Sequence, residues 1–263
     1  MITKKITMLV CSALVFGSLT GCGGMKSMPV NLETRGKIAL VSFILDKSIE
    51  KRGERDSGPG LLQNKDKYYQ YHKAALDQIF QQFLDSKSDV FGAVTMEDVE
   101  TVKSNTEYQA ITKHVPKMIM GKDISLGANY LSPEGLNYVS AYDKEKPVKV
   151  ATALNTQLLL FVENKACYDA NAAIGIGPLK ASGTAKLFLT TSFSVYSPEE
   201  KKVILTRSFE NSSDQTFALV NGEIMIDDSS YPPAISSAFQ KNLQNIKEYI
   251  ASQKQAAASA KAN

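Results

Sequence analysis

Changes in hydrophobic period along this chain constrain its fold more than any other feature. Residues 37–45 form a compact apolar run, which is typical of a buried strand. Between residues 67 and 86 the apolar side chains recur at spacings of three and four, which predicts an amphipathic helix. Residues 91–95 fit a second short strand, residues 97–113 a mostly helical stretch, and residues 157–162 another buried strand. This alternation favours a partly parallel sheet with helices packed on it.

The middle of the chain carries weaker signals. Residues 114–131 have no clear period and are expected to be irregular. Ser132-Pro133-Glu134 predicts a helix start, with Ser as the N-cap and Pro at the first helical position. Pro147 is expected to break or restart that helix, and Asn155 to end it before the strand at residues 157–162.

The second half predicts an antiparallel meander. Residues 185–196 and 202–209 read as strands, and Asn221-Gly222 is a strong hairpin signal between residues 216–220 and 223–226. We therefore expect an α/β (α+β) fold with a single mixed sheet, parallel first and antiparallel later, helices packed on it, and an amphipathic C-terminal helix. The residues expected to face the core are Leu76, Ile79 and Phe83 of the first helix and Phe239, Leu243 and Ile246 of the last.

The amino terminus has the organisation of a secretory signal. Lys4 and Lys5 precede an apolar run from Ile6 to Phe16, and small residues follow. The run is about a dozen residues, whereas a membrane-spanning helix takes roughly 20, so a stable transmembrane anchor is not expected. The segment ends in Leu19-Thr20-Gly21-Cys22, which resembles the lipobox of bacterial lipoproteins. An ordinary secretory signal that happens to end in Cys is the alternative.

The lipobox resemblance implies that the Gly21–Cys22 bond is cleaved and that the Cys22 thiol carries a diacylglycerol. Two or more acyl chains hold a protein stably on a membrane. Gly23 is not the Asp that usually marks retention at the inner membrane, so we expect the periplasmic face of an outer membrane. The expected organisation is a signal peptide (1–21), an acylated terminus and flexible tether (22–35), one periplasmic domain (36–251) and a disordered tail (252–263).

Charge and cysteine content limit the possible functions. The formal net charge of the 263-residue chain is +3, and subtracting the two signal-peptide lysines leaves +1. Such a balance gives no electrostatic reason to expect nucleic-acid binding. Cys11 lies in the signal and Cys22 in the lipobox, so Cys167 is the one cysteine left in the domain. An internal disulfide is therefore excluded, and Cys167 is expected to be a packed residue.

The sequence has no pattern typical of a catalytic or metal site. It contains only two histidines, and His72 lies on the apolar stripe of the first predicted helix, where a core histidine is expected. His114 belongs to no HExxH or paired Cys/His spacing, and GxSxG is missing. Gly175-Ile176-Gly177-Pro178 lacks the GxxxxGK[ST] of a phosphate loop and is expected to be a turn. We expect no catalytic residues, no metal and no cofactor.

Residues 46–66 are predicted to form a long, charged, turn-rich loop that leaves the carboxyl end of the first strand. Ligands of open α/β sheets tend to bind at such ends. The loop is therefore a candidate binding site, with Lys51, Arg52, Glu54 and Arg55 as its residues. A solvated, disordered loop fits the same composition equally well.

Three segments carry a family resemblance: the first strand at residues 37–45 with its Ser42-Phe43, the helix at residues 67–86, and the helix-to-strand step at residues 148–162. Their order resembles a group of bacterial lipoprotein domains that includes the curli-secretion lipoprotein, the lipoprotein activators of penicillin-binding proteins and the amino-terminal domain of TolB. The resemblance implies a non-catalytic lipoprotein that binds or scaffolds an unidentified envelope protein. A subunit of an oligomeric secretion assembly, or a ligand-binding protein or hydrolase with an unrecognised site, remains the alternative.

Overall fold

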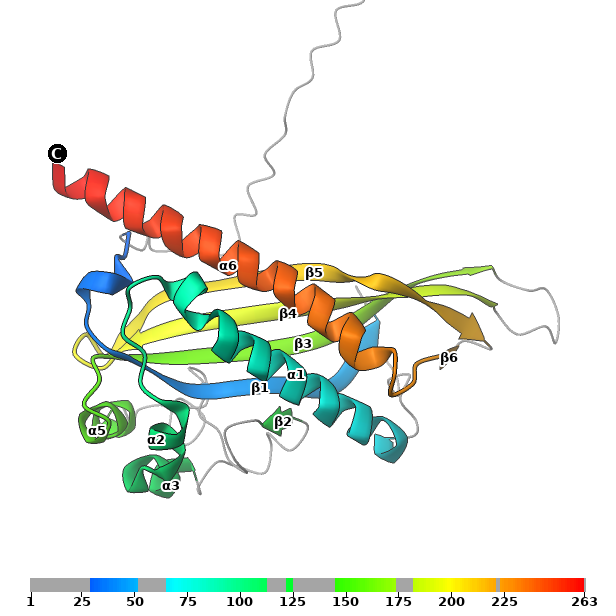
Figure 1. Cartoon of the computed structure of the whole chain (residues 1–263), viewed down its shortest axis with the longest axis horizontal. Helices are drawn as coiled ribbons and strands as arrows, with labels where there is room; N and C mark the ends of the chain where they lie inside the picture. The colour runs from blue at the N-terminus through cyan, green and yellow to red at the C-terminus, as the bar shows by residue number, and fades with distance from the viewer. Residues whose placement is uncertain are drawn as a thin grey trace, which may run out of the picture.

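The computed structural model of the chain describes residues 29–51, 65–112, 122–124, 145–173, 182–220 and 223–262. One mixed sheet with helices on both faces makes up this part of the protein (Figure 1). The elements are η1 (Leu32–Thr34), β1 (Ile38–Lys51), α1 (Lys65–Phe91), α2 (Val99–Ser104), α3 (Thr106–Thr112), β2 (Lys122–Ile124), α5 (Glu145–Ala153), β3 (Leu158–Ala173), β4 (Ser182–Ser197), β5 (Lys202–Val220), β6 (Glu223–Ile224) and α6 (Tyr231–Ala262).

The strand order is β2-β1-β3-β4-β5-β6. β1 and β3 pair in parallel, and the other neighbouring strands pair antiparallel. This arrangement confirms the predicted mixed sheet with a parallel first part and an antiparallel meander. The predicted hairpin is also confirmed, because Leu219 pairs with Ile224 and Val220 with Glu223.

The main core lies between the sheet and the two long helices, α1 and α6, which run side by side over one face (Figure 1). All six side chains predicted to face inward from these helices are at most 5% exposed. Phe43 of β1 lies at the centre, with ring centroids 5.1 Å from Phe80, 5.5 Å from Phe83 and 5.9 Å from Phe239. Because these aromatic rings come from three elements, burying them fixes the helices on the sheet.

A chain of buried polar side chains crosses the same core. Thr191 of β4 donates to Asn164 Oδ1 (2.8 Å), and Asn164 Nδ2 donates to the Ile44 carbonyl (3.0 Å). Asn242 of α6 donates to Thr191 Oγ1 (2.9 Å) and to the Leu189 carbonyl (2.8 Å). Buried polar groups are tolerated when they are paired in this way, so these bonds also specify how α6 sits on β4.

A second, smaller core covers the opposite face of the sheet, where α2, α3 and α5 pack against β1 and β3. Val41 and Phe161 supply the sheet side of this core, and Val102, Tyr108 and Val150 the helix side. The Tyr108 hydroxyl donates to the Val41 carbonyl over 2.8 Å, at the point where the β1–β3 register is interrupted. The bond satisfies a carbonyl that the irregular ladder leaves available.

Two predicted boundaries around α1 are wrong. Residues 91–95 form no strand. Instead α1 continues to Phe91, because Val90 and Phe91 are buried, and ends at Gly92 with φ +64°. The following chain makes a single parallel bridge, Met96 to Ile38. β1 likewise runs to Lys51 instead of ending before residue 46, since Ile49 is buried and pairs with β3.

The domain also extends further at both ends than predicted. The tether was expected to reach residue 35, but Val30 and Leu32 are buried and η1 is capped by the Asn31 side chain. The tail from residue 252 was expected to be disordered, but α6 continues to Ala262. Alanine has the highest helix propensity, and Lys254 pairs with Glu33 of η1 over 2.7 Å.

Several predictions lie outside the described residues: the signal and Cys22, His114, the helix start at Ser132, and the turn at Gly175-Ile176-Gly177-Pro178. Of the helices within the described ranges, none is long and apolar enough to span a membrane.

Candidate functional site

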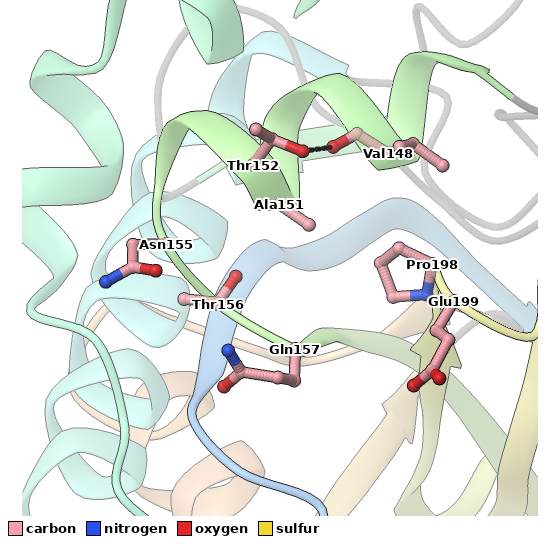
Figure 2. Close-up of a pocket in the computed structure, with 8 residues that line it drawn as sticks. All are labelled: Val148, Ala151, Thr152, Asn155, Thr156, Gln157, Pro198 and Glu199. Carbon is pink, nitrogen blue, oxygen red and sulfur yellow. Dashed lines mark hydrogen bonds between the residues drawn. The ribbon is translucent and has the colours of Figure 1, made fainter.

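A pocket of about 350 Å³ opens between α5 and the turn that joins β4 to β5 (Figure 2). Val148, Ala151 and Thr152 of α5 form one wall, and Pro198 and Glu199 face them from the turn. The floor is formed by Asn155, Thr156 and Gln157 of the segment between α5 and β3. The pocket therefore joins two segments that are distant in the sequence.

The end of α5 shapes the floor of the pocket. Asn155 has φ +50°, and its N–H donates to the Thr152 carbonyl (3.1 Å) while the Thr156 N–H donates to the Ala151 carbonyl (2.9 Å). This pair of bonds is a Schellman motif, in which a left-handed residue, often Gly or Asn, ends the helix. The predicted helix end at Asn155 is thus confirmed.

Gln157 connects the floor to the start of β1. Its Oε1 accepts from the Lys37 N–H (2.8 Å), and its own N–H donates to the Lys37 carbonyl (2.9 Å). Gly36 precedes this contact with φ +97°, and a Cβ at this position would lie 2.5 Å from Gln157 Oε1. Only a glycine permits this backbone and this approach together.

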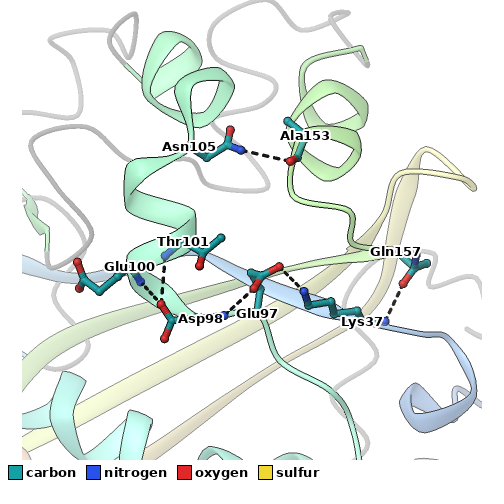
Figure 3. A network of polar contacts seen from close by, with 8 residues as sticks. All are labelled: Lys37, Glu97, Asp98, Glu100, Thr101, Asn105, Ala153 and Gln157. Atoms are coloured by element: carbon teal, nitrogen blue, oxygen red, sulfur yellow. Dashed lines mark hydrogen bonds and ion pairs between the residues drawn. The ribbon is translucent and has the colours of Figure 1, made fainter.

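A polar network continues from Lys37 to the helices beside the pocket (Figure 3). The Lys37 ammonium pairs with the mostly buried Glu97, whose other oxygen accepts from the Asp98 N–H (3.0 Å). Asp98 in turn caps α2 by accepting from Glu100 and Thr101 N–H groups (2.9 and 3.1 Å). The network holds the amino ends of β1 and α2 in place, so we assign it a structural role.

The charged residues near the turn are mostly paired with one another. Glu200 pairs with Arg35 (2.8 Å) and Lys202 (3.0 Å), and the hydrogen bond from Lys202 lowers the pKa of Glu200. Lys201 pairs with Glu145 of α5 (2.9 Å), which raises the pKa of Lys201. Within the described part of the chain, Glu199 makes no hydrogen bond or ion pair. Its carboxylate is the charge available to a ligand.

The pocket lies at the amino ends of the parallel strands β1 and β3, whereas the sequence pointed to the carboxyl end. Of the predicted binding residues, Lys51 is the last residue of β1 and pairs with Tyr168. Arg52, Glu54 and Arg55 lie outside the described residues. Lys51 does not line the pocket, and the loop prediction stays a prediction.

Two residues considered for chemistry, His72 and Cys167, lie within the described ranges, and neither lines the pocket. His72 is 4% exposed, and its Nδ1 lies 3.0 Å from the Tyr231 hydroxyl, as expected for a core histidine. Cys167 is partly buried, with Sγ 3.7 Å from Glu210 Oε2. Across the ranges that the structure describes, no three His, Cys, Asp or Glu side chains gather as a metal site would require.

Sequence reasoning missed the pocket because no local pattern marks it. Asn155 signalled the end of a helix, and Pro198 signalled a turn, but neither residue indicates that the two lie across a cavity. What the lining offers is apolar surface, amide groups and one carboxylate, which together suit binding by packing and hydrogen bonds.

No family model matches the chain, and no curated protein matches it either. A solved structure described as a homolog of a neuraminyllactose-binding hemagglutinin, from Helicobacter pylori, is 10% identical with a TM-score of 0.36, over 90% of this chain and 96% of that one. The LpoB C-terminal domain from Escherichia coli is 11% identical with a TM-score of 0.28, over 68% and 84%. A hypothetical protein from Chlamydia trachomatis is 10% identical with a TM-score of 0.34, over 83% and 99%. At these scores the likenesses carry no conclusion about this chain.

Proposed function

We propose that this chain is a lipid-anchored, non-catalytic protein of the bacterial cell envelope that binds or scaffolds another envelope protein. The anchor part of the proposal rests on the lipobox-like Leu19-Thr20-Gly21-Cys22 after a short apolar run. The binding part rests on the pocket between α5 and the β4–β5 turn, which we propose as part of the contact surface. The outer membrane is the expected location.

The composition of the pocket is the observation that supports binding. Interfaces are held by a few anchor side chains that fill pockets on the partner, and a pocket of about 350 Å³ has room for one such side chain. Val148 and Pro198 offer apolar surface to an aliphatic stem, and Glu199 offers a carboxylate without an ion pair among the described residues. An Arg or Lys side chain of the partner fits both groups.

Filling the pocket tests this proposal. Thr152 and Lys149 are both exposed on α5, but only Thr152 lines the pocket. Thr152→Trp should abolish the crosslink between this protein and its envelope partner in cells, whereas the matched Lys149→Trp should keep it. Equal melting temperatures would show that both variants fold. Retained crosslinking by Thr152→Trp would contradict the pocket as a contact surface.

The predicted loop residues need their own variant. Replacing Lys51, Arg52, Glu54 and Arg55 by Ser should leave stability nearly unchanged, because surface substitutions usually stay within about 0.5 kcal/mol each. If the loop binds the partner, the crosslink is weakened in this variant. If the crosslink is unchanged in the loop variant while Thr152→Trp loses it, the pocket belongs to the contact surface and the loop does not.

The anchor is tested at Cys22. Cys22→Ala should abolish acylation and processing and should move the protein from the membrane fraction to the soluble fraction. Mass spectrometry of the wild-type protein should show acyl mass on Cys22. A wild-type protein without that mass would refute the anchor while leaving the binding domain to be judged by the pocket variants.

A further inference from the structure

β5 is an edge of the sheet for most of its 19 residues. Its inner side pairs with β4, and its outer side pairs with β6 only at Leu219 and Val220. No other described strand lies against that outer side. Edge strands present backbone N–H and C=O groups that another strand can bind.

The register shows which residues point these groups outward. In an antiparallel pair, residues alternate between pointing both backbone groups at the partner and pointing both away. The Ala218 carbonyl accepts from Met225 N–H on the β6 side (2.8 Å), so Ala218 points away from β4. Ala218 pairs with Thr184, and every second residue of β4 from Thr184 onward has the same backbone orientation. Ser192 and Ser194 belong to this set, and they pair with Ser208 and Thr206. Thr206 and Ser208 therefore point outward.

Side-chain contacts agree with this register. Pairs that do not exchange backbone bonds bring their side chains closer together. The Ser192 and Ser208 hydroxyls are 2.7 Å apart, and the Ser194 and Thr206 hydroxyls 2.9 Å. The outward backbone groups of Thr206 and Ser208 have no partner among the described residues, so two consecutive binding positions are open on this edge.

Further along β5, α6 closes the edge. Around the register shift between Lys186 and Phe188, the Lys241 ammonium of α6 bonds to the Ser212 carbonyl (2.9 Å). The Asp214 N–H donates to the Ser237 hydroxyl (3.1 Å). A bulge and a covering helix are two ways in which proteins block an edge. Here they block one part of β5 and leave the stretch around Thr206 and Ser208 open.

Two aromatic rings and an arginine border the open stretch, and we call this border the flank. Phe209 and Tyr249 of α6 are partly buried, with ring centroids 6.1 Å apart, and the Arg207 guanidinium lies 5.8 Å from the Tyr249 ring. Among the described residues Arg207 makes no ion pair. An added strand would place alternate side chains beside this flank, where apolar groups meet the rings and a carboxylate meets Arg207.

We propose that the edge of β5 at Thr206 and Ser208 binds an extended segment of a protein partner as an added strand, and that this segment carries an acidic side chain opposite Arg207. This inference deepens the proposed function and rests on it, because it states how the partner is bound. A second copy of this chain fits less well, since two-fold pairing centred on Ser208 sets the two Arg207 side chains on a diagonal about 7–8 Å apart.

Proline at position 208 tests the backbone contact. Because the Ser208 N–H points away from β4, Ser208→Pro removes the outward donor without breaking the β4–β5 ladder. Ser208→Ala is the matched control, since it keeps the N–H. The probe is Thr-Val-Thr-Asp-Thr-Val-amide with fluorescein on its amino terminus, and its binding to the detergent-solubilised full-length protein is measured by anisotropy. We expect Ser208→Ala to bind like wild type and Ser208→Pro to bind at least tenfold more weakly.

Charge reversal tests the flank. The Arg207→Glu variant should no longer bind the Asp-containing peptide. It should instead bind the same peptide with Lys in place of Asp. Thr152→Trp, which fills the pocket of the proposed function, should bind the peptide like wild type. Failure of the pocket proposal is thereby distinguished from failure of the edge proposal.

Four results would overturn the inference: no peptide binding by wild type, equal binding by Ser208→Pro and Ser208→Ala, no change of charge preference in Arg207→Glu, or a wild-type dimer that Ser208→Pro dissociates. If Ser208→Pro does not fold, amide hydrogen exchange on wild type replaces it. The peptide should then protect the Thr206 and Ser208 amides and leave the inward Arg207 amide unchanged. Equal protection of all three would count against an added strand.

Discussion

Replacing Gly36 by Ala should destabilise the domain through the Gln157 side chain. The new Cβ would lie 2.5 Å from Gln157 Oε1 and 3.0 Å from two carbons of the same side chain, so Gln157 must move and release the Lys37 N–H. The lost hydrogen bond costs about 1 kcal/mol. A non-glycine residue at φ +97° adds strain of roughly 1–2 kcal/mol. The expected total is about 2–3 kcal/mol, or about 4–12 °C in Tm.

A double-mutant cycle separates these two contributions. Gln157→Ala alone should cost about 1 kcal/mol, the value of the bond. Gly36→Ala in that background adds only the backbone strain, because the hydrogen bond is already lost. The double variant should therefore cost about as much as Gly36→Ala alone, which corresponds to a coupling free energy of about 1 kcal/mol. Urea unfolding followed by circular dichroism measures all four proteins. Additivity within about 0.3 kcal/mol would refute the argued contact.

Gly92 provides a control for the strain itself. It has φ +64°, but an added Cβ meets only the Glu33 carboxylate, at 2.9 Å, which can turn away. Gly92→Ala should therefore cost about 1 kcal/mol, less than Gly36→Ala. The opposite order would show that the Gln157 contact is unimportant.

Three further predictions concern the two cores. Burial raises the pKa of Tyr108, so its contribution to stability is complete below the ordinary phenol pKa of about 10 and is lost as the pH rises above it. The urea midpoint of wild type should therefore fall above about pH 10. Tyr108→Phe should cost about 1–3 kcal/mol at neutral pH and should make the urea midpoint less dependent on pH above that value. The same pH dependence in Tyr108→Phe and in wild type would contradict this explanation. Asn242→Ala should cost about 3 kcal/mol because it leaves buried partners unpaired, whereas Gln244→Ala on the same helix should stay within about 0.5 kcal/mol, with both measured by urea unfolding. Leu76→Ala should cost about 2–5 kcal/mol, and a wild-type melting temperature would show that the wrong face of α1 was assigned.

Hydrophobic period predicted the fold well wherever one face of an element is buried. The inward side chains of α1 and α6 were identified because the stripe repeats over several turns, as Leu76 and Leu243 illustrate. The hydrophobic period predicted the ends of helices and strands less accurately where tertiary contacts extend an element. β5 was expected as two strands, but it continues through the register shift because Ser213 is buried and α6 binds the backbone at Ser212 and Asp214.

The candidate site was much less predictable. Asn155 and Gln157 belong to a segment whose helix end and strand start were expected, so half of the pocket was within reach of sequence reasoning. Pro198 and Glu199 reach the pocket only because β4 returns alongside β3 to the amino end of that strand. That juxtaposition depends on long-range strand pairing, which single-sequence periodicity does not encode.

If Cys22 is acylated as proposed, the docking of η1 limits the distance between the domain and the membrane. With Val30 and Leu32 buried, only the seven steps from Cys22 to Pro29 remain to span the gap, which is at most about 25 Å. A tether free to residue 35 would reach about 45 Å. The volume open to a domain lipidated at Cys22 is thereby reduced roughly sixfold, and its effective concentration toward a target near the bilayer rises by the same factor. Because Arg35 bonds to Glu200 in the β4–β5 turn, the pocket lies on the same side of the domain as η1, the side to which the proposed anchor connects.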